Sequence, residues 1–313
     1  MSINQGVHGK KMNPGGAVGM TATSDGQRVS ENEVRFLAAD GFELAGTLLL
    51  PDQPHTAVLI SAATGFPREF YLPFARLGAM RGAACLVYDY RGVGASAPAD
   101  LSSFKMDYPD WGRLDMAAAL ERLIAAAPGA PVVHIANSAG GHLAGFMPNQ
   151  NKITRHIFIG VGLGTWWTHR FPKQQLLDMF FWWIYGPLQL TMKGYIPAGG
   201  LWGGSTLPSG AFRTWRRWSH RGDYFRRELA DRLKPHQFDE MQAPIISYVF
   251  SDDPLTTAKS ARTFLAFMPR AGKEIRLKKP ADLGVRALGH QNLFRRKNEA
   301  AWSNIWDTAI NGE

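Results

Sequence analysis

The chain has 313 residues, of which 45% are apolar and 19% charged, and its formal net charge is +9. This composition is typical of a globular protein and excludes a disordered chain or one dominated by membrane-spanning segments. The single cysteine, Cys85, excludes an internal disulfide and a cysteine-based zinc site, and it fits a cytoplasmic protein.

The N-terminal segment is rich in glycine, serine, asparagine and threonine. It contains no apolar stretch long enough for a signal peptide, so we expect residues 1–30 to form a flexible leader. The most apolar later segment, residues 176–192, is interrupted by Asp178, Gly186 and Pro187. We therefore expect no stable membrane span, which needs about 20 uninterrupted apolar residues.

A regular pattern of strands and helices begins at Val34. Residues 34–39 and 42–51 predict two strands joined by a turn at Asp40-Gly41. Three short, nearly continuous apolar runs follow, as expected for strands buried on both faces of a parallel sheet. These runs are residues 57–61, 84–88 and 132–136, and predicted helices at 71–81 and 111–127 separate them.

The pattern continues toward the C-terminus. Further strands are predicted at 153–161, 244–250 and 273–279, and a final helix at 291–309. A hairpin followed by alternating strands and helices predicts an α/β protein with a mostly parallel, doubly wound sheet. Residues 31–162 and 243–313 are assigned to this core.

Residues 163–242 interrupt the alternation and hold seven of the ten tryptophans, some in pairs such as Trp166-Trp167 and Trp182-Trp183. This stretch is too long for a plain loop, so we expect a helical cap inserted over the sheet. Clustered aromatic residues usually form a core. The alternative is that some of them line an apolar acyl pocket.

The strongest local signal surrounds Ser138, in the sequence V-H-I-A-N-S-A-G-G that begins at Val133. It resembles the G-x-S-x-G nucleophile elbow, in which a serine sits on a sharp turn between a strand and a helix. That turn needs very small residues two positions before and after the serine, here Ala136 and Gly140. The motif follows a predicted strand rich in β-branched residues. This position supports a nucleophile elbow more strongly than the residue pattern alone does.

Partners for Ser138 follow later in the chain. Asp252 and Asp253 come directly after the strand predicted at 244–250, and His290 comes after the last predicted strand. The order serine, acid, histidine is that of α/β-hydrolase triads. Either aspartate could be the acid on this evidence.

On these motifs the chain resembles the α/β-hydrolase superfamily, nearest to bacterial predicted hydrolases of the serine-aminopeptidase-like and monoglyceride-lipase-like branches. The resemblance extends over residues 34–307. It rests on the elbow, on Asp253-Pro-Leu, on Gly289-His290, and on residues 89–96, which match the family pattern D-x-R-G-x-G-x-S. It implies an α/β-hydrolase fold with an inserted helical cap, but no particular substrate.

The resemblance also implies a mechanism. Ser138 would attack an acyl carbonyl while His290 takes its proton and later returns it to the leaving group. Asp253 directly precedes Pro-Leu, as the acid does in the family, and is therefore favoured over Asp252.

The tetrahedral oxyanion of such a reaction needs two backbone donors. One is expected to be the N–H of Ala139, immediately after the nucleophile. The other is expected from the loop after the strand at 57–61, where both Gly65 and Phe66 are candidates.

Other histidines are weaker candidates for function. His142 lies one helical turn after Ser138 and is expected to have a packing role, whereas His169, His220 and His236 belong to the predicted cap and could contact substrate. No metal-binding spacing and no dinucleotide fingerprint is present, so we expect neither a metal nor a cofactor.

The sequence thus predicts a serine hydrolase that cleaves a carboxylic ester or related acyl bond in a small, apolar or acyl substrate. Acyltransferase, thioesterase, amidase, haloperoxidase and lyase chemistry on the same scaffold are alternatives, as is a non-catalytic binding protein with this fold. Basic residues form only short groups, so no nucleic-acid partner is expected. The oligomeric state is left open.

Overall fold

The computed structural model describes residues 17–22, 28–200 and 202–312. Nine strands of this part of the chain form one sheet in the order β1-β2-β3-β5-β4-β6-β7-β10-β11. They are β1 (Ala17–Ala22), β2 (Arg28–Leu37), β3 (Glu43–Pro51), β4 (Thr56–Ser61), β5 (Ala83–Tyr88), β6 (Val132–Asn137), β7 (Arg155–Ile159), β10 (Ile245–Phe250) and β11 (Lys273–Lys278). The sheet is parallel from β5 to β11 and antiparallel from β1 to β5.

The central strands are the apolar runs of the sequence. Every residue of β4, β5 and β6 is buried, as expected when helices cover both faces of a parallel sheet. Strands β4 and β6 are neighbours, with Ser61 opposite Ala136. Because parallel strands end at the same edge of a sheet, the segments that follow β4, β6, β7, β10 and β11 meet there.

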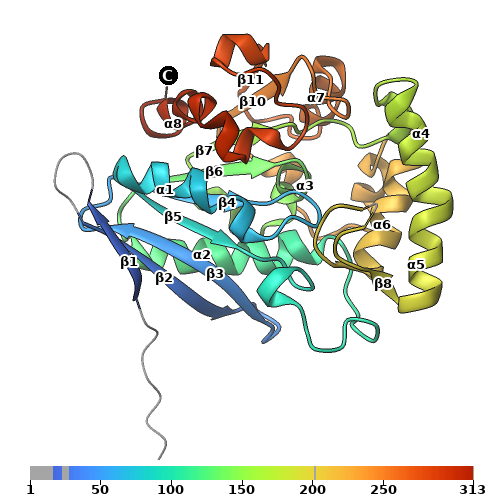
Figure 1. Cartoon of the computed structure of the whole chain (residues 1–313), viewed down its shortest axis with the longest axis horizontal. Coiled ribbons are helices and arrows are strands. Elements are labelled where there is room, and N and C mark those ends of the chain that lie inside the picture. The colour runs from blue at the N-terminus through green and yellow to red at the C-terminus, as the bar shows by residue number, and fades with distance from the viewer. Residues whose placement is uncertain (1–16, 23–27, 201, 313) are drawn as a thin grey trace, which may run out of the picture.

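Helices cover the two faces of the sheet (Figure 1). Helices α1 (Leu72–Met80) and α8 (Trp302–Ile310) share one face, and α2 (Ala117–Ala126) covers the other. Gly78 of α1 lies so close to Trp306 of α8 that a Cβ atom would be 2.1 Å from the indole ring. Helices α3 (Ala139–Leu143) and α7 (Ala258–Leu265) follow β6 and β10.

The ends of the chain differ most from the sequence-based expectation. Residues 17–22 and 28–30, assigned to a flexible leader, belong to the paired strands β1 and β2, and the rest of the leader lies outside the described residues. The final helix was expected to begin near residue 291. Instead 3₁₀ turns at Asn292–Phe294 and Arg296–Ala301 precede α8, with a non-helical backbone at Asn298.

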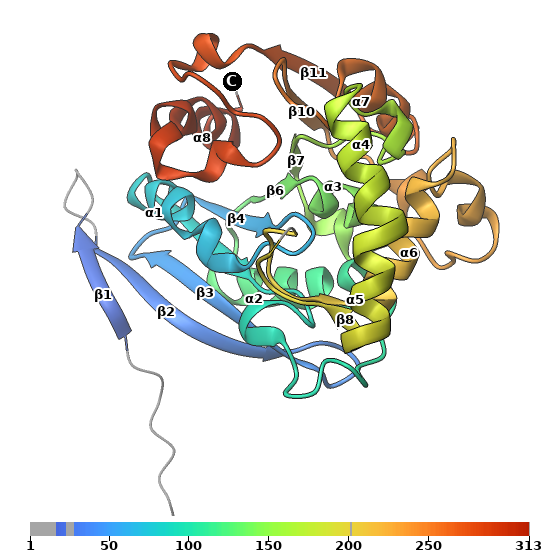
Figure 2. The same cartoon turned by 45° about the vertical axis from the view of Figure 1, so that its right-hand side comes forward.

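The inserted segment, residues 163–242, lies between β7 and β10 in the chain. It contains α4 (Lys173–Phe180), a π-helical turn (Phe181–Tyr185), α5 (Gly186–Lys193), the two-residue strands β8 (Tyr195–Ile196) and β9 (Leu207–Pro208), and α6 (Ser209–Ser219). Figure 2 shows α4 and α5 as one long rod beside the carboxyl ends of the parallel strands.

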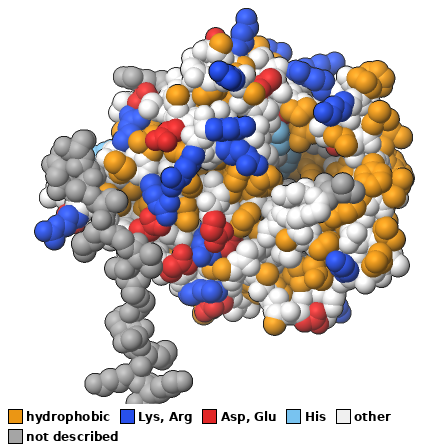
Figure 3. Space-filling view, viewed as in Figure 1, with side chains coloured by type: hydrophobic (Ala, Val, Ile, Leu, Met, Phe, Trp, Pro, Cys, Tyr) orange, Lys and Arg blue, Asp and Glu red, His pale blue; other side chains and the backbone are white. Residues whose placement is uncertain are grey.

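This rod is apolar on two sides. Inward, Trp182 is buried against Trp215 and Phe212 of α6. Outward, several apolar side chains are more than half exposed, namely Leu176, Ile184, Leu188 and Met192. Figure 3 shows apolar side chains gathered there, beside a hollow. No helix in the described part of the chain is long and apolar enough to cross a bilayer.

Candidate active site

Ser138 occupies a strained turn between β6 and α3. Its backbone has φ 48° and ψ −106°, a region that residues other than glycine rarely adopt. A Cβ atom on Gly140 would lie 2.6 Å from the carbonyl oxygen of Ser61. The turn therefore requires glycine at this position, as the elbow pattern predicts. Ala136, the residue two before the serine, is fully buried in β6.

The three residues predicted as a triad lie within hydrogen-bonding distance of one another. His290 Nε2 is 2.9 Å from Ser138 Oγ, and His290 Nδ1 is 2.8 Å from Asp253 Oδ2. An ionised carboxylate only accepts hydrogen bonds, so it selects the tautomer in which Nδ1–H donates to Asp253. In that tautomer the Nε2 lone pair faces the hydroxyl group of Ser138.

The two candidate acids make different contacts. The second oxygen of Asp253 accepts the backbone N–H groups of Leu255 at 2.8 Å and Thr256 at 3.0 Å. Among the described residues, no hydrogen bond joins Asp252 to the imidazole of His290. The Oδ2 atom of Asp252 accepts the N–H groups of Leu288 at 2.8 Å and Gly289 at 3.0 Å, in the loop that carries His290. The geometry thus favours Asp253 as the acid, and Asp252 ties the histidine loop to the end of β10.

The candidate oxyanion donors differ in availability. Ala139 is the first residue of α3, and its N–H has no hydrogen-bond acceptor within the described residues. The N–H of Phe66 donates to the carbonyl of Ala63 at 3.2 Å, across a turn in which Gly65 has φ +73°. This bond closes the turn and occupies the N–H of Phe66. Of the two candidates in this loop, Gly65 and Phe66, Phe66 is therefore the weaker oxyanion donor. Thr64, which sequence reasoning did not single out, lines the cavity beside Ser138.

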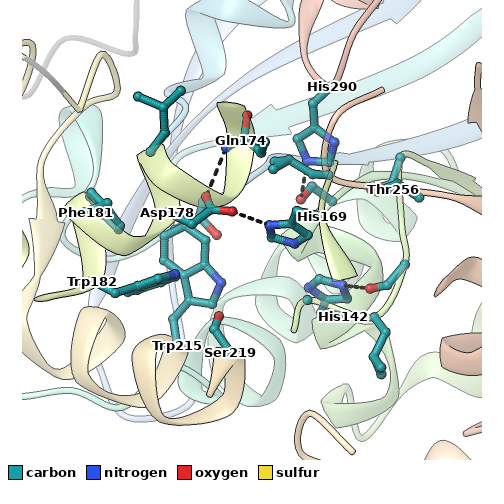
Figure 4. Close-up of a pocket in the computed structure, with 18 of the residues that line it drawn as sticks. His142, His169, Gln174, Asp178, Phe181, Trp182, Trp215, Ser219, Thr256 and His290 are labelled. Atoms are coloured by element: carbon teal, nitrogen blue, oxygen red, sulfur yellow. Dashed lines mark hydrogen bonds and ion pairs between the residues drawn. The ribbon is translucent and has the colours of Figure 1, made fainter. Parts of the chain in front are cut away.

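A cavity of about 340 Å³ opens in front of Ser138 and His290. Figure 4 shows two kinds of wall. Phe181, Trp182 and Trp215 lie on one side, and His142, His169 and His290 on the other. Of the three histidines predicted in the inserted segment, His169 lines this cavity. His220 and His236 lie instead at other surface hollows.

His142 packs as the sequence predicts but also reaches the cavity. Its ring contacts Tyr224 and Phe264, and Nε2 donates to the carbonyl of Gly162 at 2.6 Å. Burial lowers the pKa of His142 to about 4. The ring is therefore uncharged at neutral pH, and its Nε2 proton is committed to Gly162.

Buried ion pairs and close packing hold the loop after β5 in place. Asp89 is buried and accepts hydrogen bonds from the backbone and guanidinium of Arg68, both at 2.7 Å. Arg91 is paired with the buried Asp115 at 2.6 Å, and burial raises the pKa of Asp115 to about 7. A Cβ atom on Gly92 would lie 2.2 Å from Pro208. These contacts hold the loop firmly beneath the inserted segment.

The described residues contain no group of three or more histidine, cysteine, aspartate or glutamate side chains placed to hold a metal ion.

A model of the alpha/beta hydrolase family matches residues 57–296. Among solved structures, the chain is similar to a soluble variant of monoglyceride lipase from Saccharomyces cerevisiae, with 16% identity, a TM-score of 0.56, and coverage of 88% of this chain and 93% of that one.

Two esterases are similar in the same way. A cold-adapted esterase from an Arctic intertidal metagenomic library has 15% identity and a TM-score of 0.52 over 90% of this chain and 94% of that one. An esterase from Pyrococcus furiosus has 13% identity and a TM-score of 0.53 over 88% of each chain. At these identities the likeness concerns the fold alone. No curated protein matches by sequence.

Proposed function

Because the chain belongs to the alpha/beta hydrolase family, we propose that it is a serine hydrolase that cleaves carboxylic esters through an acyl-enzyme on Ser138. The observation that supports this proposal most strongly is the chain of hydrogen bonds from Ser138 through His290 to Asp253. A serine hydroxyl is a weak nucleophile unless a positioned base takes its proton. His290 is within reach of that proton, and Asp253 fixes its tautomer.

The proposed reaction has two halves. Ser138 Oγ attacks the ester carbonyl carbon while His290 Nε2 takes the hydroxyl proton, and the imidazolium is stabilised by Asp253. The tetrahedral intermediate collapses when its alkoxide leaves with the proton held on His290. Water then attacks the acyl-serine with His290 as base, which releases the acid and restores the serine. The N–H of Ala139 and a second N–H from the Thr64–Gly65 loop would stabilise both oxyanions.

We further propose that the inserted segment acts as a cap and binds the acyl chain. The aromatic side chains Phe181, Trp182 and Trp215 line the wall opposite the histidines. A mostly apolar cavity with a few polar groups is typical of small-molecule sites. The acyl chain would bury its methylene groups against these rings, each contributing about 0.8 kcal/mol if fully buried.

Labelling with a fluorophosphonate probe tests the nucleophile. We expect the wild-type protein to be labelled, Ser138→Ala to be unlabelled, and His290→Ala to be labelled more slowly by on the order of 10³-fold or more. Ser219→Ala is the matched control, because Ser219 also lines the cavity, and it should label as the wild type does. An unlabelled wild type, or labelling that persists in Ser138→Ala, would contradict the proposal.

A series of p-nitrophenyl esters of increasing acyl length tests the role of the aromatic wall. We expect kcat/KM to rise from acetate to medium-length chains, as more methylene groups reach the rings. Trp215→Ala should flatten this rise, since it removes one of those rings. Activity confined to the acetate ester would show that the wall does not bind the acyl chain.

A further inference from the structure

A second pair of aspartate and histidine faces the cavity from the inserted segment. His169 Nδ1 is 2.6 Å from Asp178 Oδ2, and the amide of Gln174 donates to Asp178 Oδ1 at 3.0 Å. His169 precedes α4, whereas Gln174 and Asp178 lie one turn apart on it. All three residues line the cavity that contains Ser138, and neither proposed step of the reaction uses them.

The contacts of Asp178 determine what His169 can do. Both carboxylate oxygens of Asp178 accept hydrogen bonds, so the imidazole must donate from Nδ1. The neutral ring then has an unprotonated Nε2, which can accept one hydrogen bond. No side chain or backbone group of the described residues bonds to this atom. The amide of Gln175 also donates to the backbone carbonyl of His169 at 3.0 Å, so the backbone that carries the ring is anchored to α4.

His169 lies on the histidine side of the cavity. Figure 4 shows it between Asp178 on one side and His142 and His290 on the other. All three histidines line the cavity that contains Ser138. His169 thus faces the same space as Ser138 and His290, beside the aromatic wall.

We propose that His169 is a specificity-determining residue whose Nε2 accepts a hydrogen bond from a hydroxyl group on the alcohol part of the ester, with Asp178 as its positioning residue. The inference rests on the proposed ester hydrolysis at Ser138. If the acyl chain lies along the aromatic wall, the alcohol part extends toward the histidines. A hydroxyl can donate to Nε2, whereas a methyl group of the same size leaves that acceptor unpaired and out of water, which costs free energy.

The test compares two esters of the same size, 2-hydroxyethyl octanoate and propyl octanoate, by the rate of octanoate release. The wild-type kcat/KM should favour the hydroxylated ester by roughly three- to tenfold, the worth of one such hydrogen bond, with the difference mainly in KM. His169→Ala should bring the ratio close to one. Asp178→Asn should do the same, because an amide N–H facing Nδ1 moves the imidazole proton to Nε2 and removes the acceptor.

His236→Ala is the matched control, since it removes an imidazole of the inserted segment that lies outside the cavity, and it should keep the wild-type ratio. A wild-type ratio near one, or a preference that persists in His169→Ala or Asp178→Asn, would overturn the inference. Fluorophosphonate labelling of each variant separates this failure from that of the proposed function. If the wild type is labelled but does not prefer the hydroxylated ester, only the role of His169 is refuted. If the wild type is not labelled, both proposals are refuted.

Discussion

At the scale of single residues, the site depends on which atoms donate and which accept. Asp253 accepts from His290 and from two backbone N–H groups, and Asp252 accepts only from the backbone before His290. Two adjacent carboxylates thus make separate contacts, one with the imidazole and the other with the loop that carries it.

Replacing each aspartate by asparagine tests these contacts separately. Asp253→Asn presents an N–H to His290 Nδ1 and favours the wrong tautomer, so kcat should fall by on the order of 10⁴-fold. Asp252→Asn keeps an oxygen that can accept from Leu288 and Gly289, and its kcat should fall by about tenfold or less. Steady-state kinetics on a p-nitrophenyl ester measures both, with thermal unfolding as the control for folding. Equal losses in the two variants would contradict the assignment of Asp253 as the acid.

The sequence predicted these residues because their motifs are local. Ser138, Asp253 and His290 each follow a predicted strand in a known order, and the structure brings them within hydrogen-bonding distance. The contact between His169 and Asp178 gave no such signal, because no motif marks the two positions and only the fold shows that they face the cavity with Ser138.

At the scale of elements, the inserted segment is tied to the loop after β4. The ring of Trp202 lies directly over Gly65, where a Cβ atom would be 2.4 Å away, and the N–H of Ser205 donates to the carbonyl of Gly65 at 2.6 Å. This loop is the proposed source of the second oxyanion donor. The position of the inserted segment and the geometry of that donor should therefore be coupled.

Two glycine variants test this coupling. Gly65 and Gly41 both have positive φ, but nothing lies within 4 Å of a Cβ atom on Gly41. Each Gly→Ala change should cost about 1 kcal/mol of folding stability from backbone strain. Only Gly65→Ala should also lower kcat, by about 10²-fold if one oxyanion donor is displaced. Equal activity of the two variants would show that the loop tolerates displacement of Trp202.

The sequence was a good guide to the parallel strands and a poor one to the connecting elements. Strands β4, β5 and β6 are continuous apolar runs because both faces are buried. Strand β1 lacks such a run. It is held by antiparallel pairing with β2, and no local sequence pattern indicates that pairing. Likewise, the expected helix at 111–127 begins with a π-helical stretch, Trp111–Met116, because residues far away in the sequence determine how these side chains pack.

At the scale of the whole molecule, buried histidines make folding depend on pH. His134 and His156 lie inside the sheet with Nδ1 atoms 3.1 Å apart, and burial lowers both pKa values, that of His156 to about 3. In the unfolded chain the pKa of a histidine is about 6.5. The unfolded state therefore binds more protons as the pH falls below 6.5, and each buried histidine then reduces the free energy of unfolding. The raised pKa of Asp115 acts in the opposite direction over the same range.

His156→Asn isolates one of these contributions. Asparagine can keep a hydrogen bond to His134 but does not titrate. Between pH 7 and pH 5 the free energy of unfolding should therefore fall by about 2 kcal/mol less in the variant than in the wild type. Urea unfolding at the two pH values measures this difference. The same pH dependence in both proteins would mean that folding does not lower the pKa of His156.

The most direct test of the central claim is to locate the covalent intermediate by mass. A p-nitrophenyl N-alkylcarbamate transfers its carbamoyl group to a catalytic serine, and the product hydrolyses slowly enough to digest with trypsin. Residues 123–152 form one tryptic peptide in which Ser138 is the only hydroxyl-bearing side chain. We predict one carbamoyl group on this peptide in the wild type and none in Ser138→Ala. A carbamoyl group on any other peptide, accompanied by loss of esterase activity, would show that Ser138 is not the nucleophile.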